Sequence, residues 1–336
     1  MQNGRVQWER FTSTVLAGNP LGDPDTRGIP VYLPPSYDTH PERRYPVVFL
    51  LSGFTGRGAM MLNDQAWSPP IDERMDRLIA AGRADEMILV MPDCFTRFGG
   101  SQYLDSSATG RYETHLIEEL VPWVDRTFRT LGSREHRGVA GKSSGGYGAL
   151  VMGMRHSDVF SAVACQSGDL YFEYCYRVDF PLALSTLQRA GGVRAFLESF
   201  EAAPQKDKAA FATLNIVAMA ACYSPDPKAE MGVALPFDLA TGAFRDDIWQ
   251  RWQQHDPLVM LEARADALKS LTLLYLDCGD RDEFHLHHGL RLFVAALKAR
   301  DIPHVSEEFP DGHMNVTYRY DTTLPLLSRA LRAGQP

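Results

Sequence analysis

The chain has 336 residues, with 34 lysine and arginine side chains against 42 aspartate and glutamate side chains, so its formal net charge is −8. An acidic chain lacks the basic face that nucleic-acid binding requires, and it is not attracted to anionic membrane surfaces. The hydrophobic fraction of 45% and this length suffice to bury a full core, so the chain can be stable without disulfides or metals.

Short runs of apolar and β-branched residues recur along the chain, and turn residues end most of them. Such runs are typical of strands buried on both faces of a parallel sheet. Two leading strands, at residues 6–16 and 29–33, are expected to be antiparallel. The buried strands are predicted at residues 46–51, 87–91, 139–140, 160–165, 271–276 and 305–309.

Between these strands the apolar residues recur at spacings of three and four, which indicates amphipathic helices. We expect Pro122 to kink the second of these helices. Strands alternating with helices predict β-α-β units and an α/β fold with a mostly parallel sheet. The helices are predicted at residues 71–81, 112–128, 147–155 and 290–299.

The alternation stops between residues 170 and 266. This part of the chain contains no predicted strand, and helices are expected at residues 182–197, 207–221 and 248–253. We interpret residues 170–266 as a helical insertion within a single domain of residues 1–336. It is expected to lie over the carboxyl edge of the sheet and form a lid or cap.

The strongest local motif is Gly141-Lys-Ser-Ser-Gly-Gly146, which lies between a short strand and a helix. This is the context of a G-x-S-x-G nucleophile elbow, in which the serine occupies a tight turn and the residues two before and two after it must be small. Glycines flank Ser143 at both positions, whereas Ser144 would place Lys142 at one of them. The motif therefore predicts Ser143 as the nucleophile, and a glycine-rich turn that only caps the helix is the alternative.

A serine nucleophile needs an adjacent base, and in this strand–turn–helix context the order along the chain is serine, acid, histidine. His313 lies in the loop after the last predicted strand, at the edge of the sheet where loops gather. His156 lies at the far end of the helix that follows Ser143, and His304 begins a strand. His313 is therefore the predicted base.

The acid is expected in the loop after the strand at residues 271–276. Asp277, Asp280, Asp282 and Glu283 are all candidates. Asp277 is still on the strand, and Asp280 directly follows a glycine turn. Asp282 lies far enough along the loop to reach the base, so it is the predicted acid, with Asp280 as its competitor.

A tetrahedral oxyanion needs two preorganised N–H donors. One is expected from Ser144, the residue after the nucleophile. The other is expected from Phe54, in the glycine-containing loop after the strand at residues 46–51, with Thr55 as the neighbouring alternative.

Taken together, these motifs resemble the putative-esterase branch of the α/β-hydrolases. That branch includes esterase D (S-formylglutathione hydrolase), enterochelin-esterase-like proteins, feruloyl esterases and mycolyltransferases. The resemblance implies an α/β-hydrolase fold and a Ser143–Asp282–His313 triad, with Phe54 and Ser144 as oxyanion donors. It rests on residues 51–55, 90–93, 141–150, 278–282 and 311–313.

Three features depart from the branch: Lys142 precedes the nucleophile, Gly56 stands where glutathione-thioester members carry cysteine, and the insertion is large. No G-x-G-x-x-G follows a strand, so no cofactor is expected. The histidines at positions 285, 287 and 288 do not share one helix face, so no metal is expected either.

The sequence thus predicts a serine carboxylic-ester hydrolase that forms an acyl-enzyme and acts on a small-molecule ester. The alternatives are an acyltransferase with the same triad and a catalytically silent scaffold used for binding. Neither a nucleic-acid partner nor a membrane span is expected, and a homo-oligomer stays open. Five cysteines without C-x-x-C spacing and an N-terminus without an apolar signal segment favour a cytoplasmic location.

Overall fold

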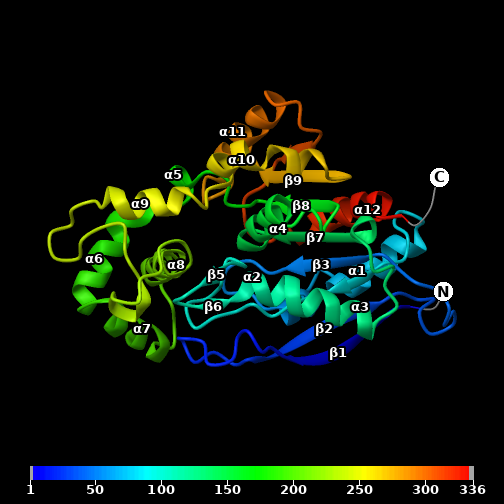
Figure 1. The fold of residues 1–336 in the computed structure, drawn as a ribbon, viewed down its shortest axis with the longest axis horizontal. Helices are drawn as coiled ribbons and strands as arrows, with labels where there is room; N and C mark the ends of the chain where they lie inside the picture. The colour runs from blue at the N-terminus through cyan, green and yellow to red at the C-terminus, as the bar shows by residue number, and fades with distance from the viewer. Residues whose placement is uncertain (1–2, 333–336) are drawn as a thin grey trace.

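An eight-stranded sheet organises residues 3–332, the part of the chain that the computed structural model describes (Figure 1). The strand order is β1-β2-β4-β3-β7-β8-β9-β10. β1 and β2 are antiparallel, as expected, and β2 is also antiparallel to β4, whereas all other neighbours are parallel. The mostly parallel α/β sheet is confirmed. Its strands are β1 (Arg5–Thr12), β2 (Thr26–Leu33), β3 (Val47–Leu51), β4 (Ile88–Val90), β7 (Arg137–Lys142), β8 (Ala162–Gln166), β9 (Leu273–Gly279) and β10 (Val305–Phe309).

The central strand β3 explains why its sequence is apolar without alternation. Val47, Phe49 and Leu51 belong to one hydrophobic cluster, and Val48 and Leu50 belong to a second cluster on the opposite face. Successive side chains of a strand point to opposite faces, so a strand covered by helices on both sides must be apolar at every position.

Helices cover both faces of the sheet. One hydrophobic cluster contains side chains of α1 (Ile71–Ala80) and α12 (Tyr320–Ala330), and these two helices contact each other. The other cluster contains side chains of helices on the opposite face. These are α3 (Val121–Thr127), α4 (Ser144–Arg155), α10 (Pro257–Lys269) and α11 (Leu286–Lys298). The result is a three-layer α/β arrangement.

The helix predicted over residues 112–128 is not uniform. It begins as α2 (Tyr112–Thr114), widens into a π-helical segment at His115–Leu120 and continues as α3. Pro122 lies in the first turn of α3, where its missing N–H and its ring would disturb a continuous α-helix. The wider turns before it absorb this disturbance, so the expected kink takes the form of a π-helical segment.

The single helix predicted over residues 182–197 is wrong, because the structure has two helices there. α6 (Phe180–Ala190) and α7 (Val193–Ala202) are separated by Gly191 and Gly192. Both glycines have positive φ angles, 88° and 119°, which an α-helix does not allow.

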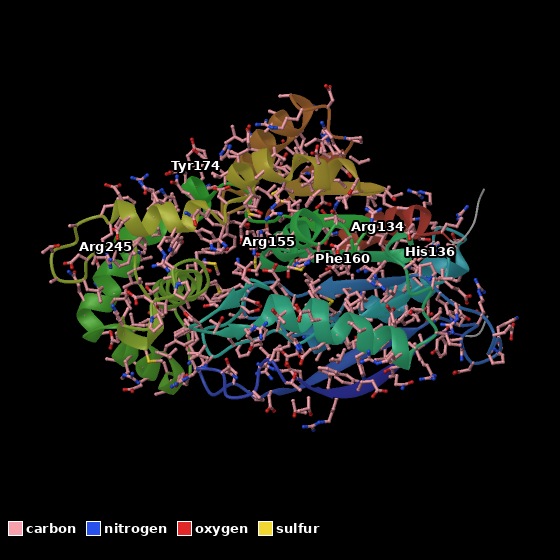
Figure 2. All side chains as sticks on the ribbon, viewed as in Figure 1. Arg134, His136, Arg155, Phe160, Tyr174 and Arg245 are labelled. Atoms are coloured by element: carbon pink, nitrogen blue, oxygen red, sulfur yellow. The ribbon has the colours of Figure 1, made fainter. Side chains whose placement is uncertain are left out.

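The helices between β8 and β9 gather at one end of the sheet, on the left in Figure 1, and the termini lie at the other end. Figure 2 places Tyr174 and Arg245 at the first end, and Arg134 and His136 near the second. These helices are α5 (Phe172–Cys175), α6, α7, α8 (Lys208–Tyr223) and α9 (Asp246–Gln253). α10 packs instead against α4, within the layer that covers the sheet.

Short elements complete the described chain. Strands β5 (Asp105–Ser106) and β6 (Gly110–Arg111) form a separate hairpin, and β5 contacts α8. Five short 3₁₀ segments lie at Gly58–Leu62, Arg134–His136, Arg177–Asp179, Glu230–Gly232 and Thr317–Arg319. Among residues 3–332, no helix has the length and apolar character needed to cross a bilayer. Residues 1–2 and 333–336 of the expected domain lie outside the described residues.

Candidate active site

Ser143 occupies a sharp turn between β7 and α4. Its φ and ψ angles are 58° and −126°, a backbone conformation that non-glycine residues rarely adopt. Two hydrogen bonds hold this conformation: the Ser143 N–H donates to the carbonyl of Gln166 at 2.8 Å, and the Ser143 carbonyl accepts from the N–H of Tyr147 at 2.9 Å. Strain that the surroundings maintain in this way is characteristic of functional serines at strand-to-helix turns.

The glycines around Ser143 are required by close backbone packing. A Cβ atom on Gly141 would lie 2.4 Å from the carbonyl oxygen of Gly145, and one on Gly145 would lie 2.1 Å from that of Leu51. Neither position can accept a side chain without moving the backbone. This packing agrees with the small-residue argument that selected Ser143 over Ser144 in the sequence.

His313 and Asp282 form a buried pair beside this turn. His313 Nδ1 lies 2.7 Å from Asp282 Oδ2, and the two residues are 4% and 2% exposed. Asp282 Oδ1 also accepts the N–H of Phe284 at 2.9 Å. Burial pushes the pKa of Asp282 up, but the hydrogen bond and charge of His313 outweigh it and hold this pKa below its usual value. The carboxylate therefore stays ionised and can orient the imidazole.

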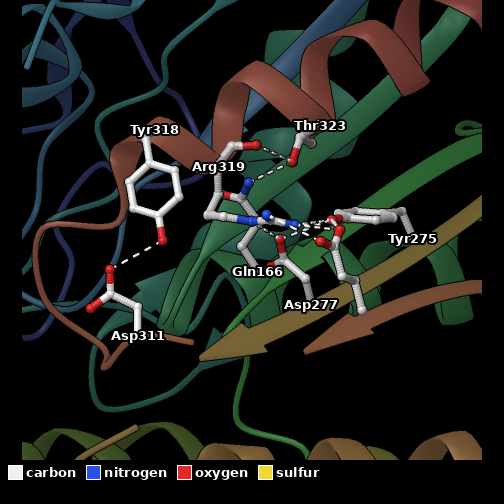
Figure 3. A network of polar contacts seen from close by, with 8 residues as sticks. Gln166, Tyr275, Asp277, Asp311, Tyr318, Arg319 and Thr323 are labelled. Atoms are coloured by element: carbon white, nitrogen blue, oxygen red, sulfur yellow. Dashed lines mark hydrogen bonds and ion pairs between the residues drawn. The ribbon is translucent and has the colours of Figure 1, made fainter. Parts of the chain in front are cut away.

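Asp277, the first of the alternative acids, belongs to a different network (Figure 3). Its Oδ2 atom accepts from Arg319 Nε at 2.9 Å and from the hydroxyl of Tyr275 at 3.0 Å. Arg319 also pairs with Glu307 at 2.6 Å. This network joins β9, β10 and the start of α12, so the carboxylate of Asp277 is engaged within the scaffold and does not face the His313 ring.

Asp280 and Glu283 are likewise engaged elsewhere. Asp280 is exposed and pairs with Arg281 at 3.4 Å. Glu283 accepts the backbone N–H of His313 at 2.6 Å, so it fixes the loop and not the imidazole. Among the four candidate carboxylates, Asp282 is the one whose side chain contacts the His313 ring.

The two proposed oxyanion donors differ from their neighbour Thr55 in hydrogen bonding. The Thr55 N–H donates to the carbonyl of Gly99 at 2.7 Å and is therefore occupied. The N–H groups of Phe54 and Ser144 have no hydrogen-bond partner within residues 3–332, and both residues line the same cavity as Ser143. Both N–H groups are therefore available to a group bound in that cavity.

This cavity has a volume of about 480 Å³ and opens over Ser143 and His313. Within the described residues no hydrogen bond joins the Ser143 hydroxyl to the His313 ring, and such contacts are often long before substrate binds. The helical insertion contributes Cys175, Tyr176, Phe211 and Asn215 to the wall. The sequence does not indicate these residues, because a helix pattern alone does not show which face of an insertion turns toward a sheet edge.

Lys142 and Asp169 are two charged residues in the wall of the cavity. Lys142 precedes the nucleophile and lies partly buried in the wall. Burial lowers the pKa of Lys142, and the negative charges of Asp282 and Glu283 oppose that effect. Asp169, in the loop after β8, was not predicted as a site residue. Its position indicates it, because it follows β8 at the same edge of the sheet as the loops after β3, β7, β9 and β10.

The histidines at positions 285, 287 and 288 lie at the start of α11. In residues 3–332 no three histidine, cysteine, aspartate or glutamate side chains stand together in a way that could hold a metal ion.

Comparison with known sequences connects this geometry to esterases. The family described as Putative esterase matches residues 24–323. An esterase of Mycobacterium tuberculosis is 33% identical over 165 residues, which are 49% of this chain and 32% of that protein. An endo-1,4-beta-xylanase/feruloyl esterase of Xylanibacter ruminicola is 30% identical over 151 residues, 42% of this chain and 19% of that protein. The aligned region spans about a third or less of the length of these relatives.

Solved structures share the fold at low sequence identity. A ferulic acid esterase has a TM-score of 0.65 and 23% identity, with 98% of this chain and 100% of that chain covered. An S-formylglutathione hydrolase from Agrobacterium tumefaciens has a TM-score of 0.60 and 18% identity, with coverage of 98% and 97%. These are α/β-hydrolase structures, so the predicted fold is confirmed. Because the family match covers most of the residues, the chain belongs to the Putative esterase family.

Proposed function

We propose that this protein is a serine carboxylic-ester hydrolase in which Ser143, His313 and Asp282 form the catalytic triad. The observation that carries the proposal is the buried His313–Asp282 pair, which shares one cavity with the strained Ser143. A carboxylate on Nδ1 fixes the imidazole so that Nε2 is free to accept a proton. The family membership supports the same reaction class.

The reaction then proceeds in two halves. In the first, Ser143 Oγ attacks the ester carbonyl while His313 Nε2 takes its proton, and the oxyanion is stabilised by the N–H groups of Phe54 and Ser144. Collapse of this intermediate breaks the bond to the alcohol, which leaves with the proton from His313. In the second half, His313 deprotonates a water molecule that hydrolyses the acyl-Ser143 ester and restores the serine.

The helices of residues 170–266 supply part of the cavity wall through Phe211 and Asn215. In our proposal they limit the length of the acyl or alcohol group and shield the acyl-enzyme from bulk water.

A panel of 4-nitrophenyl esters of increasing acyl length tests the proposal. Turnover of at least one ester and covalent labelling of Ser143 by a fluorophosphonate are the expected results. An alcohol added as a second acceptor separates the two enzyme alternatives, because an acyltransferase forms a new ester in preference to the free acid. The absence of both turnover and labelling would favour the silent scaffold.

A further inference from the structure

Asp169 occupies a fixed position in the wall of the catalytic cavity. It follows Gly168, where a Cβ atom would lie 2.4 Å from Cys165 Sγ and 3.0 Å from the N atom of Tyr147. The turn that presents Asp169 is therefore packed directly against β8 and α4. Asp169 is only 6% exposed, and it lines the same cavity as Ser143.

Within residues 3–332, one oxygen of this carboxylate accepts hydrogen bonds and the other does not. Asp169 Oδ2 accepts from the hydroxyl of Tyr176 at 2.7 Å and from Nε2 of Gln102 at 3.3 Å. Oδ1 has no hydrogen-bond partner within residues 3–332. It is also not one of the fully buried side-chain atoms that lack a partner, so it is accessible. Because the residue lines the cavity, the free lone pairs of Oδ1 are open to a bound molecule.

A second polar atom in this cluster also lacks a partner. Gln102 donates to the hydroxyl of Tyr223 at 2.8 Å, while its Oε1 atom is buried without a hydrogen bond among the described residues. The φ angle of Gln102 is 50°, so the backbone is strained at the residue that supports Asp169. Strain and unpaired buried polar atoms reduce stability, and they gather at sites that bind ligands.

The environment of the Asp169 carboxylate favours a ligand that donates a hydrogen bond to it. Burial raises the pKa of Asp169, and hydrogen bonds from Tyr176 and Gln102 and the nearby His313 only partly oppose it. A bound hydroxyl would take the place of water at Oδ1 and make a charge-assisted hydrogen bond. A purely apolar group at the same place would leave the carboxylate unsolvated and unpaired.

We propose that Asp169 is a specificity-determining residue that accepts a hydrogen bond from a hydroxyl group of the ester substrate. The inference rests on the proposed esterase function and names its substrate class, hydroxylated esters. The hydroxyl can belong to the acyl group or to the alcohol, because the cavity serves both halves of the ester. A purely structural role, in which Asp169 only ties Tyr176 of the insertion to the body of the protein, is the competing explanation.

Matched esters separate these explanations. One series has a 4-nitrophenyl leaving group and an acyl chain that is unsubstituted, hydroxylated or methoxylated at successive positions. The other series keeps the acyl group and compares ethyl, hydroxyethyl and methoxyethyl alcohols. We expect wild-type kcat/KM to be about 10- to 100-fold higher for a hydroxylated ester of one series. The methoxy analogue should behave like the unsubstituted ester, since an ether oxygen cannot donate.

The variant Asp169→Asn tests the residue itself. It keeps an acceptor for Tyr176 but turns an uncharged amide toward the cavity. We expect it to lower kcat/KM for the hydroxylated ester and to reduce the preference to about threefold or less. The matched control is Asp256→Asn, because Asp256 is also buried and accepts the N–H of Phe172 at 2.7 Å but does not line the cavity. The control should leave the preference unchanged.

Two results would overturn the proposal. Wild-type enzyme that hydrolyses hydroxylated, methoxylated and unsubstituted esters equally well has no such subsite, whatever the folding of the variants. If Asp169→Asn lowers kcat/KM by the same factor for all esters, the role of Asp169 is structural. Neither result affects the triad, whose failure shows instead as full turnover by Ser143→Ala.

Discussion

Phe54 packs edge-on against Phe211 of α8, with ring centroids 5.5 Å apart and planes inclined at 74°. Phe54 carries a proposed oxyanion donor, and Phe211 belongs to the helical insertion. The contact therefore connects the insertion to the loop that, in the proposed mechanism, holds an oxyanion donor in place. Donors of this kind act only when they are preorganised, so a loosened Phe54 would be a poor oxyanion donor.

The variant Phe211→Ala should lower kcat by about tenfold for every ester that the enzyme accepts, because one oxyanion donor contributes roughly 10²–10³ when fully removed. Steady-state kinetics across acyl lengths measure this effect. Phe200→Ala is the matched control, since Phe200 packs on Phe196 of α7 and does not line the cavity. Changes in KM that depend on acyl length, with kcat constant, would mean that Phe211 is only a wall residue.

The two adjacent serines should behave differently. Ser143→Ala should reduce kcat by on the order of 10³–10⁶, because triad members act as a unit. Ser144→Ala should cost far less, since the proposed mechanism uses only its backbone N–H. Mass spectrometry after fluorophosphonate treatment identifies the labelled residue. Modification of Ser144, or undiminished activity of Ser143→Ala, contradicts the assignment of the nucleophile.

The acid loop allows a similarly direct comparison. Asp282→Asn preserves the shape of the side chain but favours the wrong imidazole tautomer, and kcat should fall by up to about 10⁴. Asp280→Asn should change kcat little, because Asp280 is exposed and pairs with Arg281. Both variants are to be compared at equal folded concentration, checked by thermal melting. A crippled Asp280→Asn beside a nearly normal Asp282→Asn would make Asp280 the acid.

Much of the fold was predictable because local patterns of apolar and turn residues determine its strands and helices. Continuous apolar runs such as residues 46–51 identified the buried strands, since a strand covered on both faces cannot alternate. The break at Gly191 and Gly192 was missed, although two adjacent glycines are a standard signal for the end of a helix. Apolar residues continue at helical spacing across these glycines, so the spacing alone indicates one helix instead of two.

The residues of the candidate site also fall into two groups, those that local sequence patterns indicate and those whose place depends on packing. Ser143, Asp282 and His313 each follow a strand at one edge of the sheet, so chain order and turn chemistry were enough to propose them. Phe211 and Asn215 could not be proposed, because their place in the cavity depends on how α8 packs across that edge. The place of Asp169 at this edge was predictable too, since it follows β8. Chain order and turn chemistry assign only a nucleophile, an acid and a base, however, and do not indicate a substrate contact.

The pH dependence of stability gives a test of the Asp282–His313 pair that does not require activity. The pKa of Asp282 in the folded protein lies below its ordinary value, despite burial, because of its hydrogen bond to His313. Since the pKa is lower in the folded than in the unfolded state, ionised Asp282 stabilises the fold above the unfolded pKa of about 3.9. This contribution disappears as the pH falls through the lower folded value.

Urea unfolding of the wild type and of Asp282→Asn at a series of pH values measures the difference directly. The stability difference between the two should shrink as the pH falls below about 4. Asp280→Asn is the control, because Asp280 is exposed, pairs with Arg281 and does not contact the His313 ring. A wild-type advantage over Asp282→Asn that stays the same down to about pH 2 would mean that His313 does not stabilise the ionised carboxylate. The role of Asp282 in orienting the base would then have to be abandoned.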